Sequence, residues 1–305
     1  MNKLVSVIIP TYKRPETLKR SIDSVLSQTY ANVEVVVADD NGKGTEFGLK
    51  TEEVMKSYTD DVRVKYVQHE QNINGSAARN SGFRISSGEY IMFLDDDDEF
   101  LPCKVESQLK RLEELDETWG ACYSNYIRVS TDGTKLVSKC KERAEGDLLV
   151  EELKRNLFIA AGSNLMVRRE VVEEVGGFNE NFLRNQDIEF LVKVLKKYKL
   201  AYSPELGLKV YVHPRHKRKE TFEEITQKFL NSFKDVIESL SEEKRCEVYR
   251  MIDLQRFRSL VMNKATRKDA KKLIKDKRVK RFDAFRYFIH LGYRKIFRVS
   301  RGFKL

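Results

Sequence analysis

Short apolar runs alternate with amphipathic stretches through the first third of the chain. Leu18, Ile22, Val25 and Leu26 recur at helical spacing after Pro15-Glu16, which predicts a helix starting there, and Ser76–Ile85 suits a second helix. This alternation predicts βαβ units and a largely parallel α/β sheet. Four runs have the length and apolar content of buried strands: Leu4–Ile9, Val33–Ala38, Val62–Val67 and Tyr90–Leu94.

Polar residues follow three of these predicted strands directly. Pro10-Thr11-Tyr12 follows the first, Asp39-Asp40 follows the second, and Asp95 to Asp98 follow the fourth. Ligands of open parallel sheets bind outside the carboxyl ends of the strands. The pattern therefore predicts one crevice that collects all three groups.

Charge divides the 305-residue chain into two regions. Residues 214–305 hold 27 Lys/Arg against 12 Asp/Glu, whereas residues 1–213 hold 30 against 35. We therefore expect a slightly acidic catalytic domain over residues 1–213 and a basic, helical region over residues 214–305 that meets an anionic partner or mediates oligomerisation.

Composition narrows the class of protein further. A hydrophobic fraction of 41% is enough for a sizeable core, and no apolar stretch approaches the roughly 20 residues of a membrane-spanning helix. The four cysteines are widely spaced, and the first apolar run is short and closed by Pro10. These features favour a cytoplasmic protein without a disulfide framework or a secretory signal.

The acidic run Asp95-Asp96-Asp97-Asp98-Glu99 carries the most specific chemistry. Carboxylates crowded at the end of a buried strand repel one another, and burial adds to the cost of their charge. A divalent cation relieves that repulsion, and Mg²⁺-type ions are usually held by one or two carboxylates together with substrate phosphates. The run predicts a Mn²⁺ or Mg²⁺ site that binds a phosphate-bearing ligand; the alternative is a solvated acidic loop.

Five motifs in order resemble those of the family 2 glycosyltransferases. They are Val5–Pro15, Ala38-Asp39-Asp40, Ala78-Arg79-Asn80, Phe93–Asp98 and Asn185-Gln186-Asp187. The resemblance covers roughly Leu4 to His213 and implies the GT-A fold, a Rossmann-like α/β domain. It also implies a hexosyltransferase-type enzyme that moves a sugar from a nucleotide sugar, here a UDP-sugar, to an acceptor hydroxyl with inversion. The acceptor would be a glycan or a lipid-linked sugar in bacterial surface polysaccharide synthesis.

The resemblance also implies a role for each matching residue. The expected donor-binding residues are Pro10, Thr11 and Tyr12 around the nucleoside, Asp39 at the base, Arg79 near the base or diphosphate, and Asp95 and Asp96 by the ribose. Asp97 would be a metal ligand, with His213 approaching from the end of a strand over Leu208–Val212. Gly162, Ser163 and Asn164 would face the acceptor. Purely structural alternatives are a strand end at Pro10-Thr11, a turn at Asp39–Gly42, a surface Arg79, a structural His213 and an ordinary loop at 162–164.

Asp187 is the expected general base. The apolar residues Phe190, Leu191, Val194 and Leu195 predict a helix that places Asp187 in its first turn, where the helix dipole favours a carboxylate. A neutral alcohol needs proton removal to attack, and a carboxylate on the face opposite the leaving group can accept that proton. The family usually has Glu before this Asp, whereas this chain has Gln186, so a supporting contact is expected to differ. The alternative is an acid that merely favours the helix start.

The basic region suggests where the enzyme works. In Arg281–Val299, five apolar residues fall on one helical face: Phe282, Phe285, Ile289, Tyr293 and Ile296. A basic amphipathic helix with aromatic residues can lie in a membrane interface, so we expect peripheral association with an anionic cytoplasmic membrane surface. The alternative is a helical bundle with solvated charges.

Other functions are less well supported by the sequence. The QxxRW motif of processive synthases is missing, since the single tryptophan is Trp119, so we expect a non-processive enzyme. No RNA-binding or helix-turn-helix signature accompanies the basic tail, which argues against a nucleic-acid partner. A nucleotidyltransferase and a catalytically inactive sugar-nucleotide-binding scaffold remain alternatives, and a homo-oligomer is compatible with the sequence.

Overall fold

The computed structural model describes residues 2–182, 185–213, 220–263 and 266–305. The chain forms two compact units. The first comprises Met1–Leu148 and Ile159–Val212, and the second comprises Leu149–Phe158 and His213–Leu305. The sequence placed a boundary between residues 213 and 214, but nothing in its composition separates the short segment Leu149–Phe158 from its neighbours.

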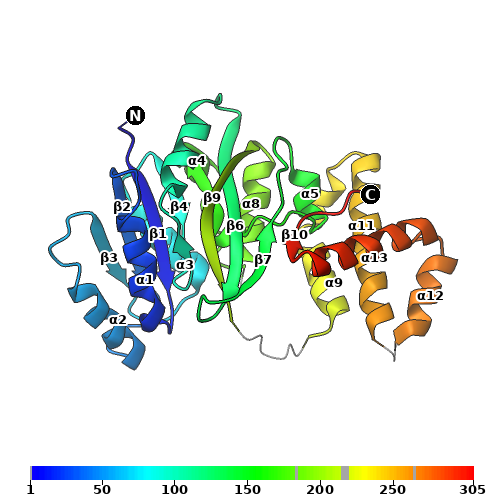
Figure 1. The fold of residues 1–305 in the computed structure, drawn as a ribbon, viewed down its shortest axis with the longest axis horizontal. Helices are drawn as coiled ribbons and strands as arrows, with labels where there is room; N and C mark the ends of the chain where they lie inside the picture. Colours follow the sequence, from blue (N-terminus) through cyan, green and yellow to red (C-terminus); the bar gives the residue numbers. More distant parts are fainter. Residues whose placement is uncertain (1, 183–184, 214–219, 264–265) are drawn as a thin grey trace. The chain divides into compact units, whose positions relative to one another are not determined.

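The first unit is built on a sheet whose amino-terminal half is parallel (Figure 1). Strand β1 (Val5–Thr11) pairs with β2 (Val33–Asp39) on one side and with β4 (Tyr90–Phe93) on the other, and β2 pairs with β3 (Val64–Gln68). Thr11 lies opposite Asp39 in the register. The polar groups that follow these strands therefore meet at one edge of the sheet, as the sequence pattern predicts.

The other half of this sheet is mixed. Strand β8 (Met166–Arg168) runs antiparallel to both β4 and β6 (Trp119–Ser130), and β6 pairs antiparallel with β7 (Leu136–Cys140). The long strand β9 (Lys199–Val212) runs parallel to β6 and antiparallel to the short β5 (Glu99–Phe100). Because β5 begins with Glu99, the last residue of the acidic run, its pairing holds that run against the carboxyl-terminal part of β9.

Helices cover both faces of the parallel half. Helix α1 (Pro15–Leu26) starts at Pro15 and buries Leu18, Ile22 and Val25 in the core cluster that contains Val7 and Ile9 of β1. Helix α3 (Gly75–Ile85) packs on the opposite face, so closely that a Cβ at Gly82 would lie 2.5 Å from Ile8 Cγ2. The remaining helices of this unit are α2 (Glu46–Lys56), α4 (Lys104–Glu113), α6 (Ala161–Asn164), α7 (Arg169–Glu174) and α8 (Gln186–Leu195).

Where the structure describes it, the second unit contains helices and the short strand β10 (Val299–Ser300). Its core contains Met251, Leu254 and Phe257 of α11 together with Tyr287 and Phe303. Among the helices that the structure describes, none combines the length and the apolar character needed to cross a bilayer. The helices of this unit are α5 (Leu149–Leu153), α9 (Phe222–Ser232), α10 (Lys234–Glu238), α11 (Glu242–Met262), α12 (Arg267–Lys275) and α13 (Arg281–Ile296).

Candidate functional site

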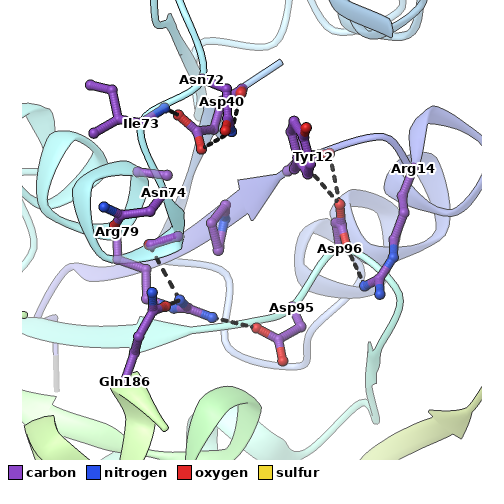
Figure 2. Close-up of a pocket in the computed structure, with 14 residues that line it drawn as sticks. Tyr12, Arg14, Asp40, Asn72, Ile73, Asn74, Arg79, Asp95, Asp96 and Gln186 are labelled. Atoms are coloured by element: carbon purple, nitrogen blue, oxygen red, sulfur yellow. Dashed lines mark hydrogen bonds and ion pairs between the residues drawn. The ribbon is translucent and has the colours of Figure 1, made fainter. Parts of the chain in front are cut away.

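A pocket of about 430 Å³ opens at the carboxyl ends of β1, β2 and β4 (Figure 2). The ends of these strands, the residues before α3, α3 itself and the start of α8 supply its walls. Six of the predicted donor residues line it: Pro10, Thr11, Tyr12, Arg79, Asp95 and Asp96. Eight further residues line it that the sequence reasoning did not single out for this role: Arg14, Asp40, Asn72, Ile73, Asn74, Gly75, Ala78 and Gln186.

Asp96 is held by the loop that follows β1. Its Oδ2 accepts hydrogen bonds from Thr11 Oγ1 at 2.8 Å and from the Tyr12 backbone N–H at 3.2 Å, while its Oδ1 lies 3.1 Å from Arg14 Nη1. Figure 2 shows the carboxylate between Tyr12 and Arg14. Burial raises the pKa of Asp96 to about 6, although the Arg14 charge and the Thr11 hydrogen bond oppose the shift. Asp96 therefore ties the first strand end to the acidic run.

Arg79 links α3 to the acidic run and to α8. Its Nη2 lies 2.7 Å from Asp95 Oδ1, and its Nη1 donates to Gln186 Oε1 and to the Gly75 carbonyl, each at 3.2 Å. A Cβ at Gly75 would lie only 3.0 Å from Gln186 Oε1, so glycine leaves room for this contact. Gln186 thus supports Arg79 with a neutral amide at the position where the family that the motifs resemble usually has a glutamate.

The two aspartates after β2 differ in orientation. Asp39 is fully buried, and its carboxylate accepts hydrogen bonds from Asn41, Tyr66 and Gln68. Asp40 lines the pocket instead. Its carboxylate accepts from the Ile73 N–H at 2.8 Å and from Asn72 Nδ2 at 2.6 Å, and it lies 2.8 Å from His69 Nδ1. The structure therefore places Asp40 in the pocket, although Asp39 was the residue expected to bind the base.

Three carboxylates of the acidic run converge. Asp95, Asp97 and Asp98 each offer an oxygen, and these oxygens lie within 4.8 Å of one another. The pKa of Asp98 is raised above its usual range because the carboxyl is buried and because Asp95 carries a negative charge nearby. A cationic side chain is already drawn to the group, since Arg14 Nη1 lies 2.6 Å from Asp97 Oδ2. An all-oxygen set with excess negative charge fits Mn²⁺ or Mg²⁺.

Helix α1 holds the backbone of this run, and strand β9 holds the Asp98 side chain. Arg20 Nη2 donates to the Asp97 carbonyl at 2.6 Å, and Ser21 Oγ donates to the Asp98 carbonyl at 2.7 Å. The Tyr211 N–H donates to Asp98 Oδ1 at 3.1 Å. His213 follows β9 as the first residue of the second unit, so its role as a metal ligand stays a prediction.

Asp187 is the second residue of α8 and is half-buried. Its pKa is raised, first by burial and then by the charge of Asp95, whereas the Arg79 guanidinium lowers it. Asp187 therefore lies within electrostatic reach of the Arg79–Asp95 pair. Its neighbour Gln186 lines the pocket.

The three residues expected to face the acceptor divide into two kinds. Ser163 Oγ accepts a hydrogen bond from the Asp95 N–H at 3.1 Å, and a Cβ at Gly162 would lie 3.2 Å from Asp95 Oδ2. Asn164 is fully buried, with its amide bonded to Lys104 Nζ, Ser124 and the Ile159 carbonyl. Gly162 and Ser163 thus adjoin the acidic run, whereas Asn164 anchors the short helix α6 from within.

Two of the pocket residues that were not predicted, Arg14 and Asn74, do carry a signal in the sequence. Arg14 stands inside the motif Val5–Pro15, and its charge precedes an acidic run that needs a counter-charge. Asn74 has the residue type of a helix N-cap and accepts from the Ala77 N–H at 3.0 Å, which fixes the start of α3 at the pocket. Asn72 and Ile73 carry no such local signal, because their place depends on how the chain returns from β3.

Comparison with known proteins places this geometry in a family. Residues 6–176, more than half of the chain, match the family model "Glycosyl transferase family 2". An uncharacterized glycosyltransferase of Rickettsia felis is 30% identical over 215 residues, which are 69% of this chain and 34% of that protein. The matched part thus spans about a third of that relative. The amylovoran biosynthesis glycosyltransferase AmsB of Erwinia amylovora is 29% identical over 194 residues, 63% of this chain and 64% of that protein.

Solved structures show the same fold. The structure of S. aureus TarS 1-349 has a TM-score of 0.64 at 18% identity, covering 85% of this chain and 73% of that one. The same protein in complex with UDP-GlcNAc has a TM-score of 0.62 at 16% identity, covering 82% and 72%. The expected GT-A type of α/β fold is thereby confirmed. With the family model matched along its sheet and acidic run, the chain belongs to glycosyltransferase family 2.

Proposed function

We propose that this protein transfers a sugar from a UDP-sugar to a hydroxyl of a glycan or lipid-linked acceptor, by non-processive single displacement with inversion. The observation that carries the proposal is the convergence of Asp95, Asp97 and Asp98 beside a pocket that also holds Arg79. Two relatives support the substrate classes: TarS has been solved with UDP-GlcNAc, and AmsB belongs to amylovoran biosynthesis, which suggests a role in surface polysaccharide synthesis.

The pocket has two chemically different ends, which suggests how a nucleotide sugar lies in it. At one end Asp40 lies with Asn72 and Ile73, offering polar acceptors and an apolar surface to a base and its ribose. At the other end the guanidinium of Arg79 lies 2.7 Å from Asp95, whereas Asp96 lies beside Thr11 and Tyr12 (Figure 2). We assign the nucleoside to the Asp40 end, with Pro10, Thr11 and Tyr12 along its side, and the diphosphate to the Arg79 end. The role first expected of Asp39 passes to Asp40.

The acidic run would hold a divalent cation. Asp97 would ligate Mn²⁺ or Mg²⁺ together with Asp95 and Asp98, and His213 is a further proposed ligand. When bound, the cation stabilises the negative charge that develops on the departing diphosphate. Arg14, which lies 2.6 Å from Asp97, balances the same carboxylates, and Arg79 adds a fixed positive charge on the pocket side.

Asp187 is the proposed general base. Burial and the charge of Asp95 raise its pKa, which makes the carboxylate a better proton acceptor than an exposed aspartate. The acceptor hydroxyl gives its proton to Asp187 as its oxygen bonds to the anomeric carbon, and the bond to the diphosphate breaks on the opposite face. Helix α6 packs against α8, so Gly162 and Ser163 are the proposed acceptor-side surface next to this carboxylate.

Asp187→Asn separates binding from turnover and so tests this proposal. We expect UDP-sugar transfer and donor hydrolysis to fall at least a hundredfold, because the amide cannot accept the proton. UDP binding measured by calorimetry should change less than threefold. Glu170→Gln, which alters an exposed acid in the first turn of α7, is the matched control and should retain full activity.

Two results would reject this assignment. Near-normal turnover by Asp187→Asn would remove Asp187 from the mechanism. If the unaltered protein binds UDP but neither transfers nor hydrolyses any donor of a nucleotide-sugar panel with Mn²⁺, the protein is a sugar-nucleotide-binding scaffold.

A further inference from the structure

Helix α13 of the second unit has two apolar faces, although a helix on a protein surface needs only one. The inner face carries Ala284 and Tyr287, which are buried, together with Phe288 and Leu291, which pack against the same core cluster. This face accounts for the packing of α13 in its own unit. It gives no reason for further large apolar side chains elsewhere on the helix.

The outer face is an exposed apolar stripe. Five of its members recur at spacings of three and four residues along α13, and Phe297 follows directly after the last of them, so the set lies along one side of the helix. Each is between 47% and 75% exposed, and the set extends about 20 Å along the axis at 1.5 Å per residue. We call this set the outer stripe: Phe282, Phe285, Ile289, Tyr293, Ile296 and Phe297.

Basic side chains lie along one side of the outer stripe. Residues 280–305 contain eight Lys/Arg and one Asp. Arg301 and Lys304, which line a groove with Ile289 and Tyr293, are exposed. Arg286 reaches across the stripe, with its guanidinium 5.7 Å from the Phe282 ring and its Nη2 donating to the Lys304 carbonyl.

A groove of about 460 Å³ runs beside the stripe, between α13 and the segment that follows β10. Ile289 and Tyr293 supply apolar walls, and Arg286, Arg301 and Lys304 supply positive charge at its edges. The groove thus offers cationic groups to a phosphate and apolar contacts to the chain attached to it. This combination matches a phospholipid better than a soluble anion.

We propose that the outer stripe docks on an anionic phospholipid surface. The stripe runs parallel to the helix axis, so one flat surface can cover all of its members. Aromatic and branched aliphatic side chains insert at the headgroup boundary while the flanking Lys and Arg meet lipid phosphates. A nucleic acid would satisfy the cations but leave Ile289 and Ile296 without apolar partners, so charge and apolarity together favour a membrane. The proposal stands on the second unit and is independent of the proposed transfer reaction.

Vesicle co-sedimentation with the full chain tests this docking. We expect the protein to sediment with phosphatidylcholine vesicles that contain 40% phosphatidylglycerol, and not with pure phosphatidylcholine. The variant Phe285→Ser/Ile289→Ser/Ile296→Ser should weaken binding at least tenfold. Met262→Ser removes an equally exposed apolar side chain from α11 and should have no effect.

The electrostatic part has its own matched pair. Arg286→Gln/Arg301→Gln/Lys304→Gln should weaken binding to anionic vesicles at least fivefold. Lys268→Gln/Lys271→Gln/Lys275→Gln removes as many charges from α12 and should weaken it less than twofold. Raising the salt from 50 to 500 mM should release part of the bound protein.

Three results would overturn the docking proposal. One is failure of the unaltered protein to sediment with anionic vesicles at low salt. Another is equal binding by the triple-serine variant, with unchanged circular dichroism showing that it folds. The third is a change from oligomer to monomer in that variant without lipid binding by either protein, which would make the stripe an interface between copies. UDP binding serves as a separate readout, so none of these outcomes depends on the catalytic site.

Discussion

Arg14 shares one guanidinium nitrogen between two carboxylates of the acidic run. Its Nη1 lies 3.1 Å from Asp96 Oδ1 and 2.6 Å from Asp97 Oδ2. Arg14 is therefore a counter-charge to carboxylates of the run that is proposed to hold a divalent cation. Two positive charges a few ångströms apart repel each other appreciably in a partly buried site. Arg14 and the cation are therefore expected to compete for Asp97.

Arg14→Ala should tighten Mn²⁺ binding in the absence of nucleotide, by roughly tenfold, or ~1.4 kcal/mol. Manganese titration followed by electron paramagnetic resonance measures this directly. Lys19→Ala, which removes an exposed charge paired with Asp23 on the same helix, is the control and should leave the affinity unchanged. Weaker Mn²⁺ binding in Arg14→Ala would show that Arg14 organises the site instead of competing for it.

Lys104 is a second residue whose charged form is destabilised by its surroundings. It is fully buried, and its Nζ donates to Asn164 Oδ1 at 2.6 Å and to the Asn164 carbonyl and Ser124 Oγ at 3.3 Å. Burial lowers the pKa of Lys104 to about 7, from 10.5. Between these values the unfolded chain binds a proton that the folded chain has released, so stability rises with pH.

We therefore expect the free energy of unfolding to gain a contribution from Lys104 between pH 7 and pH 10, at about 1.4 kcal/mol for each unit of pKa shift. Lys104→Met should lose this contribution while filling the same space. Urea unfolding of both proteins at pH 7, 8 and 9 gives the free energy of unfolding as a function of pH. The difference between the two slopes is the contribution of Lys104. Parallel slopes would show that Lys104 keeps its usual pKa in the folded protein.

At the scale of elements, the parallel half of the sheet could be predicted from the sequence, whereas in the other half only the predicted strand over Leu208–Val212 is confirmed, as the end of β9. The predicted Val33–Ala38 and Tyr90–Leu94 agree with β2 and β4 within one residue, because a strand buried on both faces is a continuous apolar run. Strands β6 and β8 mix polar and apolar residues, and β6 pairs with β8 and β9, which are remote in sequence, as well as with the neighbouring β7. Their pairing depends on contacts that no local pattern contains.

The same limit explains the exchange between Asp39 and Asp40. Side chains alternate in direction along a strand and its immediate extension, so a shift of one residue decides which of the two buried carboxylates lines the pocket. The sequence could place an aspartate at this strand end but could not choose between neighbours. Gln186 was different, because its motif fixed its position and only its contact with Arg79 required the structure.

Two helical glycines should respond in opposite ways to the same substitution. Gly82→Ala in α3 would bring a Cβ within 2.5 Å of Ile8 Cγ2, and we expect it to cost ~1–3 kcal/mol of stability and to weaken UDP binding by displacing Arg79. Gly292→Ala in α13 has open space around it and should stabilise its helix by ~0.5–1 kcal/mol. Urea unfolding and UDP calorimetry measure both effects, and a neutral Gly82→Ala would contradict the close packing of α3 on β1.

At the scale of the whole molecule, the chain leaves its first unit at Leu149 and returns at Ile159. Asn156 anchors this segment, Leu149–Phe158, to the rest of the second unit. Its Nδ2 donates to the Phe303 carbonyl at 2.8 Å, and the Phe303 N–H donates to its Oδ1 at 2.7 Å. This pair of bonds joins residues 147 positions apart. Composition could not reveal it, because one asparagine carries no signal of its remote partner.

Asn156→Ala should therefore loosen the segment around Phe303 by leaving a buried N–H and carbonyl without these partners, at a cost of ~1–3 kcal/mol for each unpaired group. Hydrogen exchange should show faster exchange of the Phe303 amide, with β1 and β2 unaffected. Asn263→Ala, at an exposed position after α11, is the control. Unchanged protection at Phe303 would contradict the structural role of Asn156.

The central claim is that Asp97 and its neighbours hold a divalent cation that a nucleoside diphosphate shares. Calorimetric titration of UDP, with Mn²⁺ and with a chelator, tests it most directly in the unaltered protein and in Asp97→Asn. We predict that Mn²⁺ strengthens UDP binding at least tenfold in the unaltered protein and less than twofold in Asp97→Asn. Equal UDP affinity with Mn²⁺ and with chelator in the unaltered protein would contradict the claim.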